Sequence, residues 1–305
     1  MQTLTTRTIK LGTRTSKLAR WQTDYILSLL NKAHPDLHYR VVEFVTQGDK
    51  VLDRPLPEIG GKGVFTEELE RGLRSGMIDL AIHSLKDLPI EDIPGLSIAA
   101  VSKRFDARDV LISAKGWTLA TLPGGARVGT SSLRRAAQLL AFRPDLSILS
   151  LRGNVDTRIR KAMQEDYDAV ILAAAGVLRL GLEHSVTEFL PINVMLPAPG
   201  QGAIAVQARS IDLELKELLM RIDHPMTNIA VTAERTFLAA LGGGCSVPVG
   251  AYAECDDTSI ELNGIVASID GQKVIRVSGK DSDPRVLGRR LADQALAQGA
   301  GELLL

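Results

Sequence analysis

A glycine-rich loop carries one of the two cysteines of the chain. It reads Gly242-Gly243-Gly244-Cys245 and continues as Ser246-Val247-Pro248. A thiolate is the strongest nucleophile that a protein offers at neutral pH, and it forms stable thioethers with carbon electrophiles. Glycines beside the sulfur let a bulky group approach it closely. The loop by itself fits two interpretations, which are covalent attachment at Cys245 and a tight turn around a small buried cysteine.

Arginine recurs at three junctions, near residues 12–16, 129–135 and 151–154, where a predicted strand gives way to a predicted helix. The N-terminus of a helix already favours anions, because its first N–H groups are unpaired and its dipole is positive there. An arginine in the first helical turn opposes that dipole, so stability alone would not place it there. The repetition favours binding of several carboxylates or phosphates over a set of solvated arginines. The junction arginines are Arg14, Arg134, Arg135 and Arg152.

A Lys86-Asp87 pair follows the predicted buried strand 78–83. Ligands of open α/β sheets bind outside the carboxyl ends of the strands, so this pair is placed to bind and polarise a substrate. A turn in which Asp87 caps the backbone and Lys86 points into solvent fits the same residues. His83, which ends the strand, is expected to be a hydrogen-bonded core residue rather than a catalyst.

Two kinds of folding pattern position these residues. From residue 8 to 222, apolar runs typical of strands alternate with helical periodicity, which predicts an α/β fold. Predicted strands cover 8–12, 41–46, 78–83, 96–101, 109–113, 127–129, 147–151, 168–173 and 203–207, and predicted helices cover 18–30, 65–73, 133–140, 158–163 and 213–222. A long polar loop is expected over 48–60 and a turn carrying Arg179 over 176–181. Breaks near Ser102 and over 197–202 are candidate domain boundaries.

The end of the chain changes pattern. A helix over 229–241 leads to the cysteine loop, and three strands follow at 249–254, 259–267 and 273–278. Asp270-Gly271 joins the last two strands and is a hairpin signal. A closing helix is predicted over 284–298. The helix, the three antiparallel strands and the last helix make a small α+β domain.

Length and composition exclude several classes of protein. The 305 residues suggest two or three domains, and 45% hydrophobic with 24% charged residues is typical of globular proteins. A formal net charge of zero argues against a sequence-independent nucleic-acid binder. The apolar run 169–180 is too short to span a bilayer, and the first residues do not form a secretory signal. Two cysteines cannot build a disulfide framework and lack zinc-ligand spacing, so a cytoplasmic chain without a metal site is expected.

Five segments together resemble the porphobilinogen deaminase family, also called hydroxymethylbilane synthases. They occur in the order and at the spacing of that family, and the resemblance runs from about Thr8 to about Leu296. The segments are Gly60-Gly61-Lys62-Gly63, His83-Ser84-Leu85-Lys86-Asp87-Leu88-Pro89, Val128-Gly129-Thr130-Ser131-Ser132-Leu133-Arg134-Arg135, Leu151-Arg152-Gly153-Asn154 and Gly243-Gly244-Cys245-Ser246-Val247-Pro248.

The resemblance implies three domains. Residues 1–102 with 203–220 and residues 103–202 would form two α/β domains like those of type II periplasmic binding proteins, with a hinge and a cleft. Residues 221–305 would form the third, a small α+β domain with a three-stranded antiparallel sheet. Its loop would carry the cofactor-bearing cysteine.

The resemblance also implies an enzyme of haem and tetrapyrrole biosynthesis. It would be a transferase that condenses four porphobilinogen molecules head to tail into the linear hydroxymethylbilane and releases four ammonia molecules. A dipyrromethane cofactor, made from the substrate, would be held by a thioether to Cys245. Porphobilinogen would be the small-molecule partner of a monomeric chain that binds neither nucleic acid nor membrane.

By the same resemblance, Asp87 would be the catalytic residue, because a carboxylate there can bind the pyrrole N–H groups and stabilise developing positive charge. Each pyrrole brings two carboxylates, which suit the bidentate guanidinium group. The cofactor-binding residues would be Cys245, Lys86, Ser132, Arg134, Arg135 and Arg158. The substrate-binding residues would be Arg14, Ser16, Arg152, Arg179, Lys62, Phe65 and Gln201. The loop over 48–60 would act as a lid.

Two other functions fit part of the pattern. A carboxylate-binding protein of the periplasmic-binding type, without catalysis, would explain the arginines but not Cys245 or the third domain. A cysteine acyl transferase would need a histidine beside the thiol, and no histidine shows a partner motif for it. The histidines weighed for that role are His34, His38, His184 and His224.

The sequence departs from the family pattern at three positions. Gly242 stands where many members have an acidic residue, Gln47 where several have Arg or Thr, and Glu58 where some bacterial members have Lys. These departures bear on the lid and on the third domain, not on the reaction. Cys255 matches no motif and is expected to be a packing residue.

Overall fold

The computed structural model describes residues 8–50, 63–164, 166–244, 247–256 and 258–304. The chain divides into two compact units. Unit 1 comprises residues 1–104 and 203–228, and unit 2 comprises residues 105–202 and 229–305. The chain therefore passes from one unit to the other after Arg104, Gly202 and Asn228.

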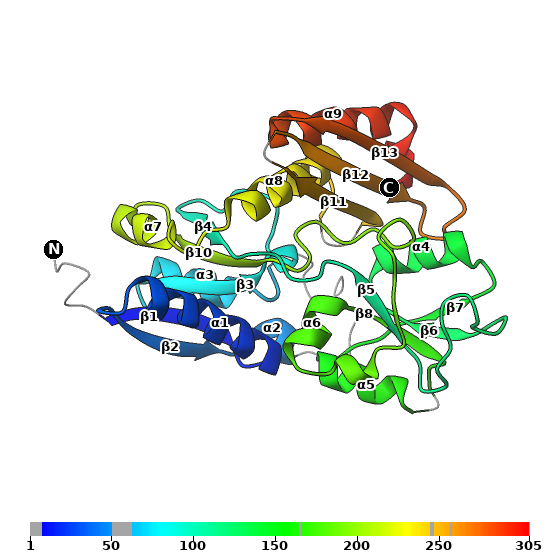
Figure 1. Cartoon of the computed structure of the whole chain (residues 1–305), viewed down its shortest axis with the longest axis horizontal. Coiled ribbons are helices and arrows are strands. Elements are labelled where there is room, and N and C mark those ends of the chain that lie inside the picture. Colours follow the sequence, from blue (N-terminus) through cyan, green and yellow to red (C-terminus); the bar gives the residue numbers. More distant parts are fainter. Residues whose placement is uncertain (1–7, 51–62, 165, 245–246, 257, 305) are drawn as a thin grey trace. The chain divides into compact units, whose positions relative to one another are not determined.

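Unit 1 is built on a five-stranded sheet in the order β2-β1-β3-β10-β4 (Figure 1). Strands β1, β2 and β3 are parallel, whereas β10 runs antiparallel to both of its neighbours. Helices α1 and α7 pack on one face and α3 on the other. The bounds are Thr8–Arg14 (β1), His38–Phe44 (β2), Leu80–Ser84 (β3), Leu96–Val101 (β4), Ile204–Arg209 (β10), Lys17–Ala33 (α1), Glu67–Arg74 (α3) and Leu213–Leu219 (α7).

Unit 2 contains a second five-stranded sheet, in the order β7-β6-β8-β5-β9. Strands β6, β7 and β8 are parallel, and β5 runs antiparallel to both β8 and β9. Helix α4 packs on one face, and α5 and α6 pack on the other. The bounds are Asp109–Ile112 (β5), Arg127–Gly129 (β6), Ser147–Leu149 (β7), Ala169–Ala173 (β8), Glu188–Phe189 (β9), Leu133–Phe142 (α4), Val155–Ala162 (α5) and Ala174–Arg179 (α6).

The two sheets share one topology. In each, three parallel strands are followed by an antiparallel strand that comes just after a crossing of the chain, β10 in unit 1 and β5 in unit 2. The start of that strand lies beside the carboxyl end of its parallel neighbour, because Ile204 pairs with Ser84 and Asp109 pairs with Ala173. The segments that follow the parallel strands therefore lie together at the carboxyl ends of those strands, which is where ligands of α/β sheets bind. We call this end of each sheet the sheet edge.

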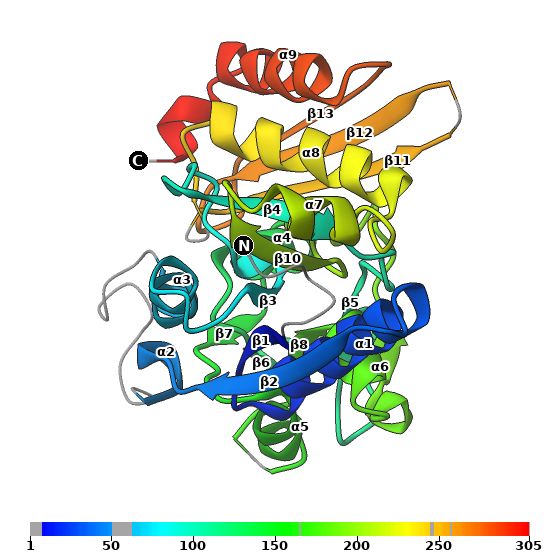
Figure 2. The ribbon, with the colours of Figure 1, turned by 90° about the vertical axis from the view of Figure 1, so that its left-hand side faces the viewer.

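A third, antiparallel sheet of β11-β12-β13 completes unit 2. Helices α8 and α9 pack together beside it, as Figure 2 shows. Gly264 on β12 lets the ring of Phe237 from α8 rest on the strand, because any Cβ there would overlap that ring. The bounds are Pro225–Ala240 (α8), Val249–Cys255 (β11), Ile260–Ala267 (β12), Val274–Asp281 (β13) and Pro284–Ala297 (α9).

These sheets confirm the predicted fold class of two α/β sheets and a small three-stranded antiparallel sheet. The three domain boundaries remain a prediction, since the division into compact units puts the third sheet together with the second. Cys255 ends β11 and is partly buried.

Three local predictions were wrong. Residues 47–50 form a short helix, α2 (Gln47–Lys50), where a loop was expected. Arg179 ends a buried helix, α6, rather than lying in a turn, because a short apolar run does not distinguish a strand, a turn and a buried helix by periodicity. Helix α8 begins at Pro225 instead of 229, and a proline in the first helical position is a start signal that the apolar pattern concealed.

Candidate active site

Asp87 ends a short 3-10 helix, η3 (Leu85–Asp87), that directly follows β3. The N–H of Leu85 donates to the carbonyl of Ala203 at 3.0 Å, and the N–H of Leu88 donates to the carbonyl of Leu85 at 3.2 Å. The side chains of Leu85 and Leu88 are buried, whereas Asp87 is exposed and Lys86 is half-buried. The turn is therefore anchored in the core of unit 1 and presents its carboxylate at the sheet edge.

The junction between β1 and α1 lies at the same edge of unit 1, because β1 and β3 are parallel neighbours. Arg14 is the last residue of β1, and its guanidinium carbon lies 4.2 Å from the ring centre of Phe65, a cation–π contact. Ser16 is the N-cap of α1, and its hydroxyl accepts a hydrogen bond from the N–H of Ala19 at 3.3 Å. Unit 1 thus brings Arg14, Ser16, Phe65 and the Lys86-Asp87 turn to one edge.

His83 lies on β3, within the core and just before the Asp87 turn. Its side chain is 5% exposed, as expected for a core histidine. Burial lowers the pKa of His83 to about 4, the neighbouring polar side chain of Gln207 opposes part of that change, and the positive charge of Arg14 adds to it. The imidazole is therefore neutral at physiological pH.

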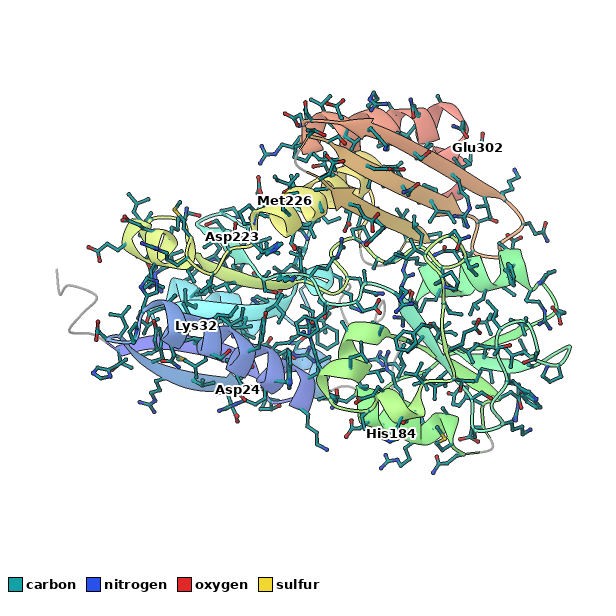
Figure 3. All side chains as sticks on the ribbon, in the orientation of Figure 1. Asp24, Lys32, His184, Asp223, Met226 and Glu302 are labelled. Carbon is teal, nitrogen blue, oxygen red and sulfur yellow. The ribbon has the colours of Figure 1, made fainter. Side chains whose placement is uncertain are left out.

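The buried His83 should make the protein less stable in mild acid. Between about pH 6.5 and the folded-state pKa of about 4, the unfolded chain binds a proton that the folded chain does not. The free energy of unfolding should then fall with decreasing pH across this window, by at most about 1.4 kcal/mol per pH unit from this group. Urea unfolding at several pH values should show a flatter profile for His83→Gln. The control is His184→Gln, which replaces an exposed histidine (Figure 3) and should follow the wild type; an equal slope in His83→Gln would contradict the prediction.

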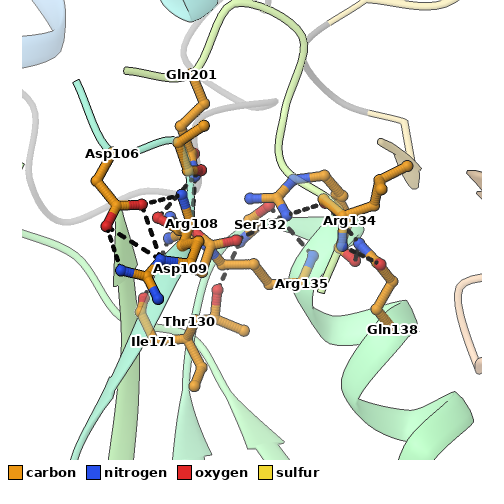
Figure 4. Close-up of polar contacts among 12 residues, drawn as sticks. Asp106, Arg108, Asp109, Thr130, Ser132, Arg134, Arg135, Gln138, Ile171 and Gln201 are labelled. Carbon is orange, nitrogen blue, oxygen red and sulfur yellow. Dashed lines mark hydrogen bonds and ion pairs between the residues drawn. The ribbon is translucent and has the colours of Figure 1, made fainter. Parts of the chain in front are cut away.

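Asp109 is the centre of the polar cluster in unit 2 (Figure 4). Its carboxylate is fully buried at the start of β5. Oδ2 accepts from Nη1 of Arg134 at 2.8 Å, and Oδ1 accepts from Nη2 of Arg135 at 2.7 Å and from Nε2 of Gln201 at 2.9 Å. Burial alone would raise the pKa of Asp109, but the charges of Arg134 and Arg135 outweigh it and hold that pKa well below its usual range.

The two arginines of this cluster differ in how many of their guanidinium nitrogens are hydrogen-bonded to the protein. Arg135 is 6% exposed and all three of its guanidinium nitrogens are bonded, with Nε and Nη2 on Asp109 and Nη1 on the carbonyl of Ile171. Arg134 is 4% exposed and bonds through Nη1 to Asp109 and to the carbonyl of Leu196. Its Nε is buried without a hydrogen-bond partner among the described residues. The solvated-arginine interpretation is therefore wrong for both residues.

The turn over 199–202 ties this cluster to the rest of unit 2. Gln201 is 1% exposed and also donates to the carbonyl of Ala107 at 2.7 Å. Arg179 donates to the carbonyl of Gly202 at 2.8 Å and stacks over Phe105 at 4.6 Å. Glu234 on α8, fully buried, accepts from the N–H of Gly200 at 2.7 Å and from that of Ala253 at 2.8 Å.

The remaining site residues of unit 2 lie at two helix starts. Ser132 is the N-cap of α4 and accepts from the N–H of Arg135 at 3.4 Å. Arg152 precedes α5, and Nε of Arg158 in that helix donates to the carbonyl of Gly153 at 2.7 Å. Because β6 and β7 are parallel neighbours, both helix starts lie at one edge of the sheet.

Cys245 and Lys62 lie outside the described residues, as do residues 51–60 of the predicted lid and with them Glu58. The described part of the cysteine loop begins with Gly242, whose φ is +69°, a left-handed conformation suited to glycine. In the described part of the chain, no group of three or more His, Cys, Asp or Glu residues is arranged to hold a metal ion. No described helix is long and apolar enough to cross a membrane.

Comparison with known proteins identifies the family of this chain. Residues 9–217 match the family model "Porphobilinogen deaminase, dipyromethane cofactor binding domain", and residues 228–297 match "Porphobilinogen deaminase, C-terminal domain". The chain belongs to the porphobilinogen deaminase family. The porphobilinogen deaminase of Moorella thermoacetica is 51% identical over 298 residues, covering 97% of this chain and 95% of that protein. That of Roseiflexus castenholzii is 52% identical over 297 residues, covering 97% and 98%.

Solved structures of low sequence identity show a much weaker likeness to this chain. The periplasmic VFT2 domain of Bordetella pertussis BvgS has a TM-score of 0.42 at 17% identity, covering 70% of this chain and 86% of that domain. The BenM effector binding domain with benzoate has a TM-score of 0.43 at 14% identity, covering 70% and 90%. The fold assignment rests on the sheet orders described above.

The family membership confirms the predicted enzyme. The chain is a transferase of tetrapyrrole biosynthesis that acts on porphobilinogen and uses a dipyrromethane cofactor. Membership does not favour the non-catalytic carboxylate-binding alternative. The acyl-transferase alternative gains nothing from the histidines, since His34 and His224 bond to Leu218 and Thr227 and the other two weighed are exposed.

Two functional candidates of this chain, Asp109 and Glu234, were not predicted from the sequence. Both are carboxylates with no exposed surface, and each holds groups that come from distant parts of the sequence. For Asp109 the available signal was an acidic residue at the start of an otherwise apolar strand, because a buried charge needs partners. Glu234 has polar neighbours on its helix, among them Thr232 and Arg235, and carried no such signal.

Proposed function

We propose that Asp87 is the catalytic residue of this enzyme and that the arginines at the sheet edge of unit 2 hold the carboxylates of the cofactor and the growing chain. The observation that carries the proposal is the anchored turn after β3, which exposes the Asp87 carboxylate while Leu85 and Leu88 stay buried. A carboxylate fixed in this way needs little reorganisation to meet a charge that develops in a transition state.

The residues of unit 2 fit a cofactor that carries carboxylates. Arg134 is almost fully buried, and its Nε has no hydrogen-bond acceptor among the described residues. A buried donor without an acceptor is costly, so a ligand oxygen at that position would stabilise it. Arg134, Arg135, Arg158, Ser132 and Lys86 would hold the dipyrromethane, with Cys245 as its attachment point. When bound, the group supplies the free pyrrole carbon to which the first new ring is joined.

Asp87 would act on the substrate that arrives. Loss of ammonia from porphobilinogen leaves a cationic carbon whose charge is shared with the pyrrole nitrogen. The Asp87 carboxylate would accept a hydrogen bond from the pyrrole N–H, stabilise the positive charge and assist the later proton loss. Arg14, Ser16, Arg152, Arg179, Lys62, Phe65 and Gln201 would bind the substrate.

Arg135 and Gln201 would contribute to these sites through Asp109, because the described contacts already engage their donor groups. We further propose a monomer that acts in the cytoplasm and takes no nucleic acid. The balanced charge of 36 basic and 36 acidic residues supports the last point, and sedimentation analysis would measure the first.

Intact-mass measurement tests the attachment at Cys245. The protein purified from a host that makes porphobilinogen should carry an adduct of two linked pyrrole units, and Cys245→Ser should lack it because a serine hydroxyl is a far weaker nucleophile. Cys255→Ser removes the other thiol and is the matched control, which should keep the adduct. An unmodified wild type, or an adduct that survives in Cys245→Ser, would refute the attachment.

A further inference from the structure

The carboxylate of Asp109 is the only acidic group among the described residues that bonds to Arg134 or Arg135. It bonds to both of them and to Gln201, and the three come from α4 and from the turn at 199–202. Its own backbone is held on both sides, since it starts β5 opposite Ala173 and its carbonyl accepts from the N–H of Leu190 at 2.9 Å. Asp109 is thus a fixed point against which both guanidinium groups are aligned.

The cluster of Asp109, Arg134 and Arg135 has an uneven charge. Two guanidinium groups face one carboxylate, and all three side chains are more than nine-tenths buried. An excess charge in a desolvated place is unfavourable until an anion compensates it. The excess is one positive charge, and the unbonded Nε of Arg134 belongs to the same cluster. The cluster therefore has the charge and a donor for a single ligand carboxylate.

Stability alone is a poor explanation for such a cluster. A buried ion pair costs desolvation that often cancels its attraction, so apolar residues of similar size would hold β5 and α4 together as well. What an aspartate adds is a fixed guanidinium geometry and a defined net charge, which matter to a ligand that must bind in one orientation.

We propose that Asp109 is a positioning residue for cofactor loading: it aligns Arg134 and Arg135 and sets their cluster to one net positive charge, which one carboxylate of the incoming pyrrole chain neutralises. The inference rests on the proposed assignment of these arginines to the cofactor. Asp109 does not contact the ligand itself: Arg135 helps to hold Asp109, and the effect of Asp109 on the ligand passes through Arg134, whose Nε is not engaged by the described residues.

Loading of apo-protein measures this role at the step in which the cofactor is formed, separately from product formation by the loaded enzyme. Apo-protein made in a host that lacks porphobilinogen would be mixed with porphobilinogen, and the adduct would be followed by intact mass over time. Asp109→Asn keeps the size but turns one acceptor into a donor that faces a guanidinium, so loading should slow about 10- to 100-fold. Asp79→Asn is the control, because Asp79 pairs with Arg209 in unit 1 at 3.0 Å and is 7% exposed. It should lower the melting temperature and leave loading unchanged.

A second comparison separates net charge from general damage, and it holds even if Asp109→Asn does not fold. Arg135→Gln makes the cluster neutral, whereas Asp109→Asn combined with Arg135→Gln restores one positive charge. If the two substitutions only caused independent damage, their effects would add and the double variant would load more slowly than Arg135→Gln. If net charge matters, the double variant should instead load at least about 3-fold faster than Arg135→Gln.

The outcomes are distinct. Loading of Asp109→Asn at the wild-type rate, equal slowing in Asp79→Asn, or a double variant no faster than Arg135→Gln would each overturn the role of Asp109 while the proposed function stands. Wild-type apo-protein that acquires no adduct from porphobilinogen would overturn both.

Discussion

Replacing Asp87 with asparagine should leave the protein folded and loaded with its cofactor while lowering turnover by about 10³-fold. The side chain is exposed on an anchored turn, so an isosteric change costs the fold little. A neutral amide still accepts a hydrogen bond from a pyrrole N–H, but it neither stabilises a cation as a carboxylate does nor takes a proton. The loss should therefore fall on kcat more than on KM.

The measurement pairs porphobilinogen consumption with intact mass and a melting curve. Asp92→Asn is the matched control, because it removes an exposed carboxylate a few residues further along unit 1. It should retain wild-type turnover. Turnover of Asp87→Asn within a few-fold of the wild type, with normal loading, would show that another group carries the catalysis.

Replacing Gly271 with alanine should destabilise unit 2 by about 3 kcal/mol. Gly271 is in the turn between β12 and β13 and has a φ of +71°, which disfavours any side chain. A methyl carbon there would lie 2.5 Å from the backbone nitrogen of Ala141 and 2.6 Å from the backbone oxygen of Ala137. These atoms belong to α4 and cannot move aside, so the hairpin turn must lift off the helix.

Urea unfolding should separate the collision from the backbone strain. Gly116→Ala is the control, because its φ is +69° and a methyl group there meets nothing within 4 Å. It should cost about 1 kcal/mol, the strain alone. If both variants lost a similar free energy of unfolding, the hairpin turn would be able to move away from α4 at little cost. The position of α4 would then not depend on the third sheet.

Much of the fold could be predicted from local patterns. The strand 96–101 and the helix α4 carry their own apolar periodicity, and Asp270-Gly271 marks the connection between β12 and β13. Helix α6 could not be predicted, because residues 174–179 are too few and too apolar for a period to show. The resemblance supplied the three-domain division, which the residues alone only suggested.

The candidate site was predictable in part, and Arg135 shows why. Its position against the helix dipole predicted a ligand carboxylate or phosphate, and the anion that it contacts in the structure is Asp109, which lies 26 positions earlier in the chain. No local pattern links residues so far apart; only the pairing of β5 beside β8 brings them together. Whether Arg134 and Arg135 also bind a ligand carboxylate stays a prediction that the loading experiment addresses.

The two sheets share one topology, but their strands occupy different positions along the chain. These positions fix the order in which the sheets can form during synthesis. All five strands of the second sheet lie within residues 109–189, so that sheet is complete once this stretch has been made. Strand β3 ends at Ser84, but its partner β10 starts only at Ile204, so one edge of β3 waits without its partner for about 6–24 s at the usual pace of translation. The ribosome thus delivers the arginine-bearing sheet before the sheet that carries Asp87 can close. An unpaired edge is prone to aggregation, which makes slow translation of residues 85–203 a hazard particular to this chain order.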